Sequence, residues 1–103
     1  MKELKNLLER AMKEISDTTD LFYQQKDQEA FSKLNATLVI TSSVMEQLFA
    51  TLNTEVHPDF DQNELVSILT NAMNAMEEKD TVLLADILRY ELLEQFEQIA
   101  AQL

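Results

Sequence analysis

The chain offers few side chains that could act as catalysts. It contains one histidine, His57, beside its only proline, Pro58, and it has no cysteine and no glycine. A cysteine nucleophile, a thiolate metal site and a disulfide are therefore impossible. A serine–histidine–acid site would have to use His57, and the turn that presents such a serine, like the loops that cradle phosphates, is built with glycine. We therefore predict that the protein is not an enzyme.

Carboxylates are the remaining groups that could bind a metal. Di-iron helical bundles use inward-facing Glu-x-x-His pairs, which one loop histidine cannot supply. Glu91, Glu94 and Glu97 recur every three residues and could touch a divalent cation from one side of a helix. A solvated face explains them better, and negative charge near a helix C-terminus opposes the helix dipole, which favours a basic partner across this end. The sequence predicts neither a metal nor a cofactor.

The charge is strongly negative and unevenly distributed. The net charge is −11 at pH 7, of which residues 1–52 carry −2 and residues 53–103 carry −9. Such a field disfavours nucleic acid and anionic membranes as partners. The charged first ten residues do not resemble a signal peptide, and no apolar run is long enough to span a bilayer, so a cytoplasmic location is expected. The acidic half either keeps the protein in solution or offers a surface to a basic partner.

Apolar residues recur at spacings of three and four along nearly the whole chain, which predicts amphipathic helices. The expected helices cover about 2–25, 28–53, 62–78 and 81–102. Asp27, Asp61 and Asp80 are expected to cap the helices that follow them. Because short breaks make neighbouring helices antiparallel, the sequence predicts an all-α fold, an antiparallel four-helix bundle built from two helical hairpins, as one domain over residues 1–103.

Each expected helix has one apolar stripe that we assign to the core. In the first two helices the stripes are Leu4, Leu7, Leu8, Ala11, Ile15, Thr18 and Phe22, then Phe31, Leu34, Leu38, Met45, Leu48, Phe49 and Leu52. In the last two they are Leu65, Ile68, Leu69, Ala72, Met73 and Met76, then Leu84, Leu88, Leu92, Phe96, Ile99 and Leu103.

The second helix has an unusual surface. Between Leu34 and Thr54 its only charged residue is Glu46, whereas a helix side that faces water normally carries lysine and glutamate. The side opposite the core stripe carries Ala36, Val39, Ile40, Ser43, Gln47 and Ala50, and the last helix has a similar excess at Leu83, Ile87 and Tyr90. These nine residues are predicted to form a protein interface, because monomers rarely expose large apolar patches. The alternative is a broader core that covers them.

Residues 75–92 resemble a segment of small all-helical bacterial proteins, of the type found in Firmicutes, that have no assigned function. The similarity rests on Lys79-Asp80, Leu83-Leu84-Ala85-Asp86 and Tyr90-Glu91-Leu92, and the chain departs from the pattern at Arg89, where an acidic residue is usual. The resemblance implies a small bacterial helical protein and brings no active site with it.

These observations favour a non-catalytic helical interaction protein, an adaptor or chaperone. It would form a homodimer or bind a partner helix through the helix over residues 28–53. The alternative is an acidic decoy or antagonist that binds a basic protein electrostatically. Binding of the second kind would weaken strongly as ionic strength rises.

Overall fold

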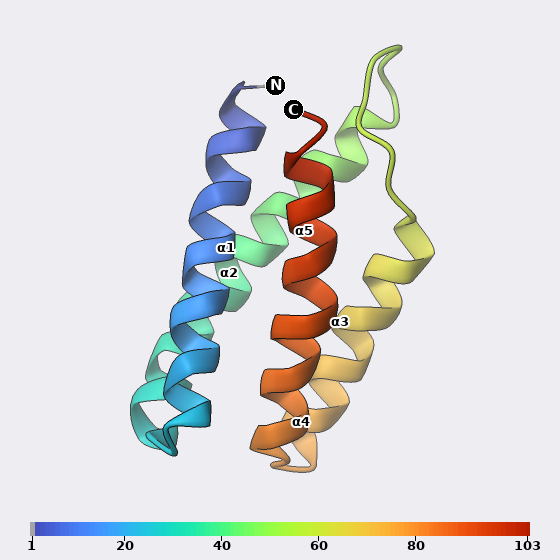
Figure 1. Ribbon diagram of the computed structural model, residues 1–103. Helices are drawn as coiled ribbons and strands as arrows, with labels where there is room; N and C mark the ends of the chain where they lie inside the picture. Colours follow the sequence, from blue (N-terminus) through green and yellow to red (C-terminus); the bar gives the residue numbers. More distant parts are fainter. Residues whose placement is uncertain (1) are drawn as a thin grey trace.

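The computed structural model describes residues 2–103, and within them it contains helices and no strand. Three helices, α1 to α3, are followed by a fourth that runs without a break from α4 through a π-helical segment, η1, into α5 (Figure 1). The bounds are Lys2–Tyr23 for α1, Asp27–Thr51 for α2, Gln62–Glu77 for α3, Thr81–Asp86 for α4, Ile87–Leu92 for η1 and Leu93–Ala100 for α5. The predictions of an all-helical chain and of four helices are confirmed, and every helix begins and ends within two residues of its expected bounds.

The helices pack mainly around α1 and the rod formed by α4, η1 and α5. α1 contacts α2 extensively and also contacts all three parts of the rod, while α3 packs on α4 and η1. α2 crosses obliquely behind the rod, and a loop that projects beyond the helices connects it to α3 (Figure 1). α2 and α3 make few contacts with each other. The edge between these two helices is therefore left open.

Both short turns close in the same way, although neither contains glycine. Gln25 and Lys79 adopt left-handed backbone angles, with φ of 61° and 58°. After α1, the amide of Lys26 donates to the carbonyl of Leu21 at 2.9 Å, and after α3 the amide of Asp80 donates to that of Ala75 at 3.0 Å. This is the Schellman closure, which satisfies carbonyls that the helix end leaves free.

The capping predictions are confirmed at two of three positions. Asp61 and Asp80 accept hydrogen bonds from the amides of Glu64 and Leu83, at 3.1 and 3.0 Å. The prediction for Asp27 is wrong, because the turn after α1 places Lys26 at the capping position, where no side chain bonds to the helix. Asp27 becomes the first residue of α2, where its charge still interacts favourably with the helix dipole.

We expect Asp80→Ala to lower the free energy of unfolding by about 0.5–2 kcal/mol, because the amide of Leu83 loses its acceptor. Urea unfolding followed by circular dichroism measures the change. Asp27→Ala is the matched control, since it removes the same charge at a helix start without removing a capping bond, and its effect should be smaller. Equal unfolding curves for Asp80→Ala and the unmodified protein would show that the cap contributes nothing.

The core draws on all four helices, and its largest fully buried side chain is Phe96. Three residues expected in the core are exposed instead: Phe31 by 42%, Leu52 by 41% and Met73 by 61%. Others lie at its margin, half-buried: Leu7, Leu38, Phe49, Leu69, Met76 and Leu103. In α2 the reason is that Thr37 and Thr41 are buried together with Ile40, so the buried stripe lies further round the helix than the apolar residues alone indicate.

The π-helical segment keeps one stripe of the rod in line. Leu84, Leu88, Leu92 and Phe96 follow one another at four-residue spacing and are all buried. In a regular α-helix three such steps would advance by about 120° beyond three full turns, which would carry Phe96 away from the core. The wider turn over Ile87–Leu92 removes a large part of this drift. A run of uninterrupted four-residue spacings is thus the sequence signal for η1.

Candidate functional site

The exposed surface of α2 carries most of the residues predicted for an interface. Val39 is 62% exposed, Ala36, Gln47 and Ala50 are exposed, and Ser43 is half-buried. We call Ala36, Val39, Ser43, Gln47 and Ala50 the α2 face, because their spacing of three and four places them on one side of the helix. On the rod, Leu83 and Tyr90 are also exposed, by 42% and 64%.

Two of the nine predicted interface residues belong to the core. Ile40 is 9% exposed and Ile87 is 4% exposed. Ile40 lies three residues after the buried Thr37 and four before the buried Val44, so it continues the buried stripe of α2. Ile87 begins η1, which packs against α3. The broader core considered as the alternative therefore explains these two residues.

The open edge between α2 and α3 forms an apolar groove, which the sequence did not indicate. Its volume is about 340 Å³. The apolar lining consists of Leu38 from α2 and of Leu69, Ala72, Met73 and Met76 from α3, and the polar lining consists of Thr41, Ser42 and Glu77. We call these eight residues the α2–α3 groove. Its size lies at the lower end of the range of sites that bind small molecules or a few side chains.

Thr41 lines this groove with a hydroxyl that has no hydrogen-bond partner among the described residues. The side chain is 2% exposed. Other hydroxyls of α2 donate to their own helix: Thr37 to the carbonyl of Lys33, and Ser43 to that of Val39. A buried hydroxyl without a partner destabilises a protein by about 1–3 kcal/mol. The hydroxyl oxygen is covered by neighbouring side chains, so a ligand in the groove could bond to it only where those side chains move aside.

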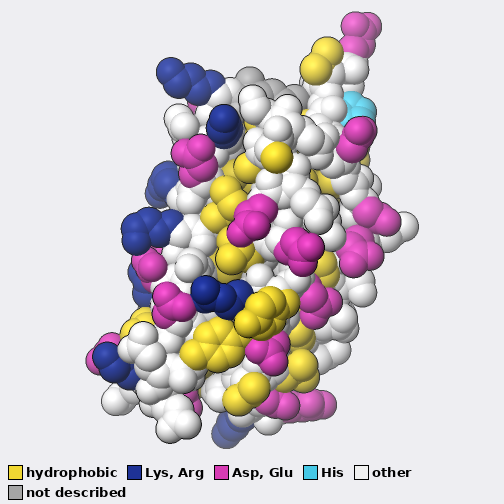
Figure 2. Space-filling model, viewed as in Figure 1, with side chains coloured by type: hydrophobic (Ala, Val, Ile, Leu, Met, Phe, Trp, Pro, Cys, Tyr) yellow, Lys and Arg dark blue, Asp and Glu magenta, His cyan; other side chains and the backbone are white. Residues whose placement is uncertain are grey.

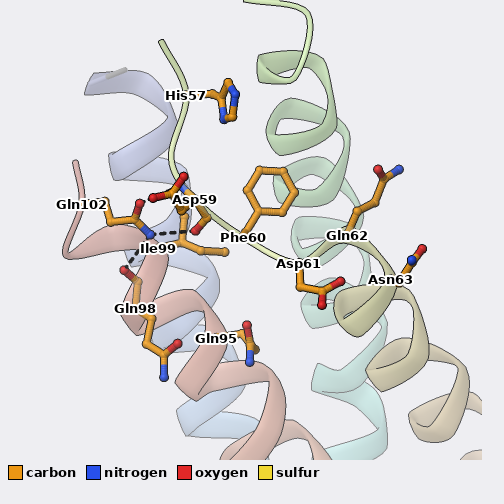
Figure 3. Close-up of a pocket in the computed structure, with 10 residues that line it drawn as sticks. All are labelled: His57, Asp59, Phe60, Asp61, Gln62, Asn63, Gln95, Gln98, Ile99 and Gln102. Atoms are coloured by element: carbon orange, nitrogen blue, oxygen red, sulfur yellow. Dashed lines mark hydrogen bonds between the residues drawn. The ribbon is translucent and has the colours of Figure 1, made fainter.

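A second, shallower hollow lies between the loop and α5, with a volume of about 700 Å³ (Figure 3). Gln102 holds the loop through both atoms of its amide: Oε1 accepts from the amide of Asp59 at 2.6 Å, and Nε2 donates to the carbonyl of Asp59 at 2.8 Å. Phe60 lies between the loop and α2 (Figure 3) and stacks on Phe49, with ring centroids 6.1 Å apart. These contacts fix the loop on the helices.

His57 is at the rim of this hollow, where its Nδ1 donates to the carbonyl of Pro58 at 3.0 Å. The other polar side chains that line the hollow are glutamine and asparagine amides and the carboxyls of Asp59 and Asp61. Glu91, Glu94 and Glu97 are exposed on the rod. Within residues 2–103, no three histidine, cysteine, aspartate or glutamate side chains are placed to hold a metal ion together.

A polar cluster joins α1 to the π-helical segment. Arg89 donates to the carboxylate of Asp20 at 2.8 Å and to the hydroxyl of Thr19 at 3.1 Å. Its guanidinium also lies 6.0 Å from the ring centroid of Tyr23, whose hydroxyl donates to Asp86 at 2.7 Å. On the face shown in Figure 2, most Lys and Arg side chains lie along the α1 side, and Asp and Glu are spread over the rest among uncharged and hydrophobic side chains.

This cluster predicts a pH dependence of stability. Partial burial of the Tyr23 phenol, its hydrogen bond to Asp86 and the negative charge of that group hold the pKa of Tyr23 above its usual value. The unfolded chain then releases this proton near pH 10 while the folded chain keeps it. The stabilisation is complete below about pH 10 and is lost as the pH rises further.

We therefore expect the free energy of unfolding to fall above about pH 10, and Tyr23→Phe to flatten that fall. Urea unfolding between neutral pH and this range measures both curves. Equal slopes for the unmodified protein and Tyr23→Phe would contradict the assignment.

The fold and these surfaces define an all-helical protein with a nearly uncharged helix face beside an apolar groove. Within the described residues no helix is both long and apolar enough to cross a lipid bilayer. The chain belongs to the family described as a domain of unknown function, DUF8042, which matches it over residues 1–102. The comparisons with curated proteins and with solved structures find no match.

Proposed function

We propose that this protein is a non-catalytic interaction protein, an adaptor or chaperone of the bacterial cytoplasm, that binds a partner helix or a second copy of itself through α2. In this proposal the chain is one domain, with its four helices in an antiparallel bundle. The observation that carries the proposal is the α2 face, where Val39 is 62% exposed on a helix whose only charge between Leu34 and Thr54 is Glu46.

The size of the side chains on the α2 face supports a helix as the partner. Ala36, Ser43 and Ala50 are small, and the distance between two packed helices falls with the size of the side chains between them. Leu83 and Tyr90 would add a second contact area on the rod, where a tyrosine can bury its ring and keep its hydroxyl in water. The resemblance of residues 75–92 to small helical proteins of Firmicutes supports the bacterial setting.

Two variants test the use of the α2 face. Val39→Glu places a charge in the middle of the face, and Val56→Glu makes the same change in the loop, at a valine that is 79% exposed. If the protein forms a dimer, light scattering should show that Val39→Glu dissociates it and that Val56→Glu does not. A dimer that both variants leave intact would contradict self-association through α2.

A photo-crosslinking residue at position 39, introduced in the source cells, tests the partner-helix form. We expect one defined partner to be crosslinked from position 39 and not from position 56, with the attachment site on a helix. A protein that is monomeric at high concentration and that crosslinks to nothing from position 39 would overturn the proposal.

The acidic half of the chain supports a second candidate function, the binding of a basic protein as a decoy or antagonist. Residues 53–103 carry −9 of the net charge of −11. Binding through this charge should weaken steeply between about 50 and 500 mM salt, because exposed charges are screened. Association through the apolar side chains of the α2 face should weaken less over the same range, although Arg10, Lys13 and Lys33 lie beside Ala36 and Val39.

A further inference from the structure

We infer that the α2–α3 groove is a binding site for a cationic amphipathic helix of another protein, one that carries an uncharged polar residue among its apolar anchors. This inference rests on the proposed function, since it names the partner class of the same interaction protein. It adds a site that is separate from the α2 face.

The dimensions of the groove fit the apolar face of a helix. On α3 its lining runs from Leu69 to Glu77, which at 1.5 Å per residue is about 12 Å. Anchors at positions i, i+4 and i+7 of a bound helix span about 10 Å, which is how amphipathic helices occupy grooves. Met73 and Met76 supply flexible, polarisable walls that can adapt to such anchors.

The hydroxyl of Thr41 specifies the polar residue. Thr41 is one of the groove residues, and its hydroxyl is covered and has no partner within residues 2–103. A bound helix with only aliphatic side chains would leave it unpaired. A helix that moves the covering side chains aside and places a serine, threonine, asparagine or glutamine one turn from an anchor would exchange a hydrogen bond with it. The groove therefore favours an apolar face that is interrupted by one uncharged polar residue.

Charge specifies the rest of the partner. Glu77 lies in the groove lining, Glu78 and Asp80 follow it, and the whole chain carries −11. Lysine or arginine beside the apolar anchors would complement this field. A second copy of this chain does not supply such a helix. Its most basic helix is α1, which carries four of the eight basic residues, but the apolar side of α1 is buried in its own core at Leu4, Leu8 and Ile15.

The test uses a labelled 16-residue peptide with leucine at i, i+4 and i+7, serine at i+3, and lysine and alanine elsewhere. Fluorescence anisotropy at 150 mM salt should show binding to the full-length protein and at least tenfold weaker binding to Met73→Glu. Val66→Glu, at a valine of α3 that is 47% exposed and lies outside the groove, makes the same charge change and should bind at least as tightly as the unmodified protein. A purely electrostatic attraction would strengthen binding to both variants, which would overturn the inference.

A peptide variant and a protein variant together test the role of Thr41. Replacing the peptide serine by alanine should weaken binding to the unmodified protein about three- to tenfold, the range of one hydrogen bond. The same replacement should have no such effect on Thr41→Val, which keeps the shape of the side chain and removes the hydroxyl. Equal losses of affinity in both proteins would show that the hydroxyl of Thr41 does not contact the ligand. A peptide of the same composition in scrambled order that binds equally well would overturn the choice of a helix as the occupant.

The outcomes for this groove and for the α2 face can be told apart. Crosslinking from position 39 together with failure of the peptide experiment leaves the proposed function standing and removes this site. If only Met73→Glu abolishes peptide binding and nothing is crosslinked from position 39, helix recognition is confined to the groove. A dimer of the unmodified protein that Met73→Glu dissociates would identify a second copy as the occupant and would overturn the choice of a heterologous partner.

Discussion

Replacing Ile40 by glutamate should destabilise the protein by about 3–5 kcal/mol, because a charge would be placed in the core without a partner. Ile40 is 9% exposed and lies between buried residues of α2. The neighbouring Val39 is 62% exposed, so Val39→Glu should change stability by no more than about 0.5 kcal/mol. Two consecutive residues of one helix are thus expected to respond very differently to the same substitution.

Urea unfolding followed by circular dichroism separates the two variants. The unfolding midpoint should shift far to lower urea for Ile40→Glu and stay near that of the unmodified protein for Val39→Glu. A folded Ile40→Glu of normal stability would show that this side chain faces solvent. In that case Ile40→Glu, and not Val39→Glu, would be the variant with which to test association through α2.

The second large effect is expected at Phe96, the largest fully buried side chain. Phe96→Ala should cost about 3–5 kcal/mol, since it leaves a cavity between the rod and the other helices. Phe31→Ala removes the same atoms at a ring that is 42% exposed and packs edge-to-face on Phe22, with centroids 5.1 Å apart. That loss should be no more than about 2 kcal/mol.

Thermal or urea unfolding of the two alanine variants measures the difference. If Phe31→Ala proved as damaging as Phe96→Ala, Phe31 would belong to the core, as the apolar spacing of α2 first indicated. The comparison therefore tests the orientation of α2 as well as the packing of the rod.

The helix bounds could be predicted from the sequence because they depend on local signals. The spacing of apolar residues and the caps at Asp61 and Asp80 act within one or two turns of the chain. The orientation of α2 could not be predicted in the same way. Its buried side includes Thr37, whose hydroxyl is satisfied by the carbonyl of Lys33 and by the hydroxyl of Thr18, 2.8 Å away. A threonine paired in this way is compatible with the core, yet in a sequence pattern it counts as polar.

The α2 face was found from the sequence because a long run without charge is visible there. The α2–α3 groove could not be found in this way, because it depends on how far α2 diverges from α3. That divergence follows from the packing of α2 on α1 and of α3 on the rod. The polar contacts of Arg89 were also out of reach, since they join residues about 70 positions apart. The exposed Met73 and the buried, unpaired Thr41 both line the groove, and neither is unusual in the sequence.

The two left-handed turns have a consequence for how the chain folds. Gln25 and Lys79 adopt a backbone conformation that is unfavourable by roughly 1–2 kcal/mol for residues with a side chain. This cost offsets part of the stabilisation from the hydrogen bonds that close each turn, so the turns are poor nuclei for the helical hairpins. We therefore expect the rate-limiting step of folding to draw its stabilisation from contacts between helices, with the turns closing late. Substitutions at Gln25 and Lys79 would then alter the unfolding rate far more than the folding rate.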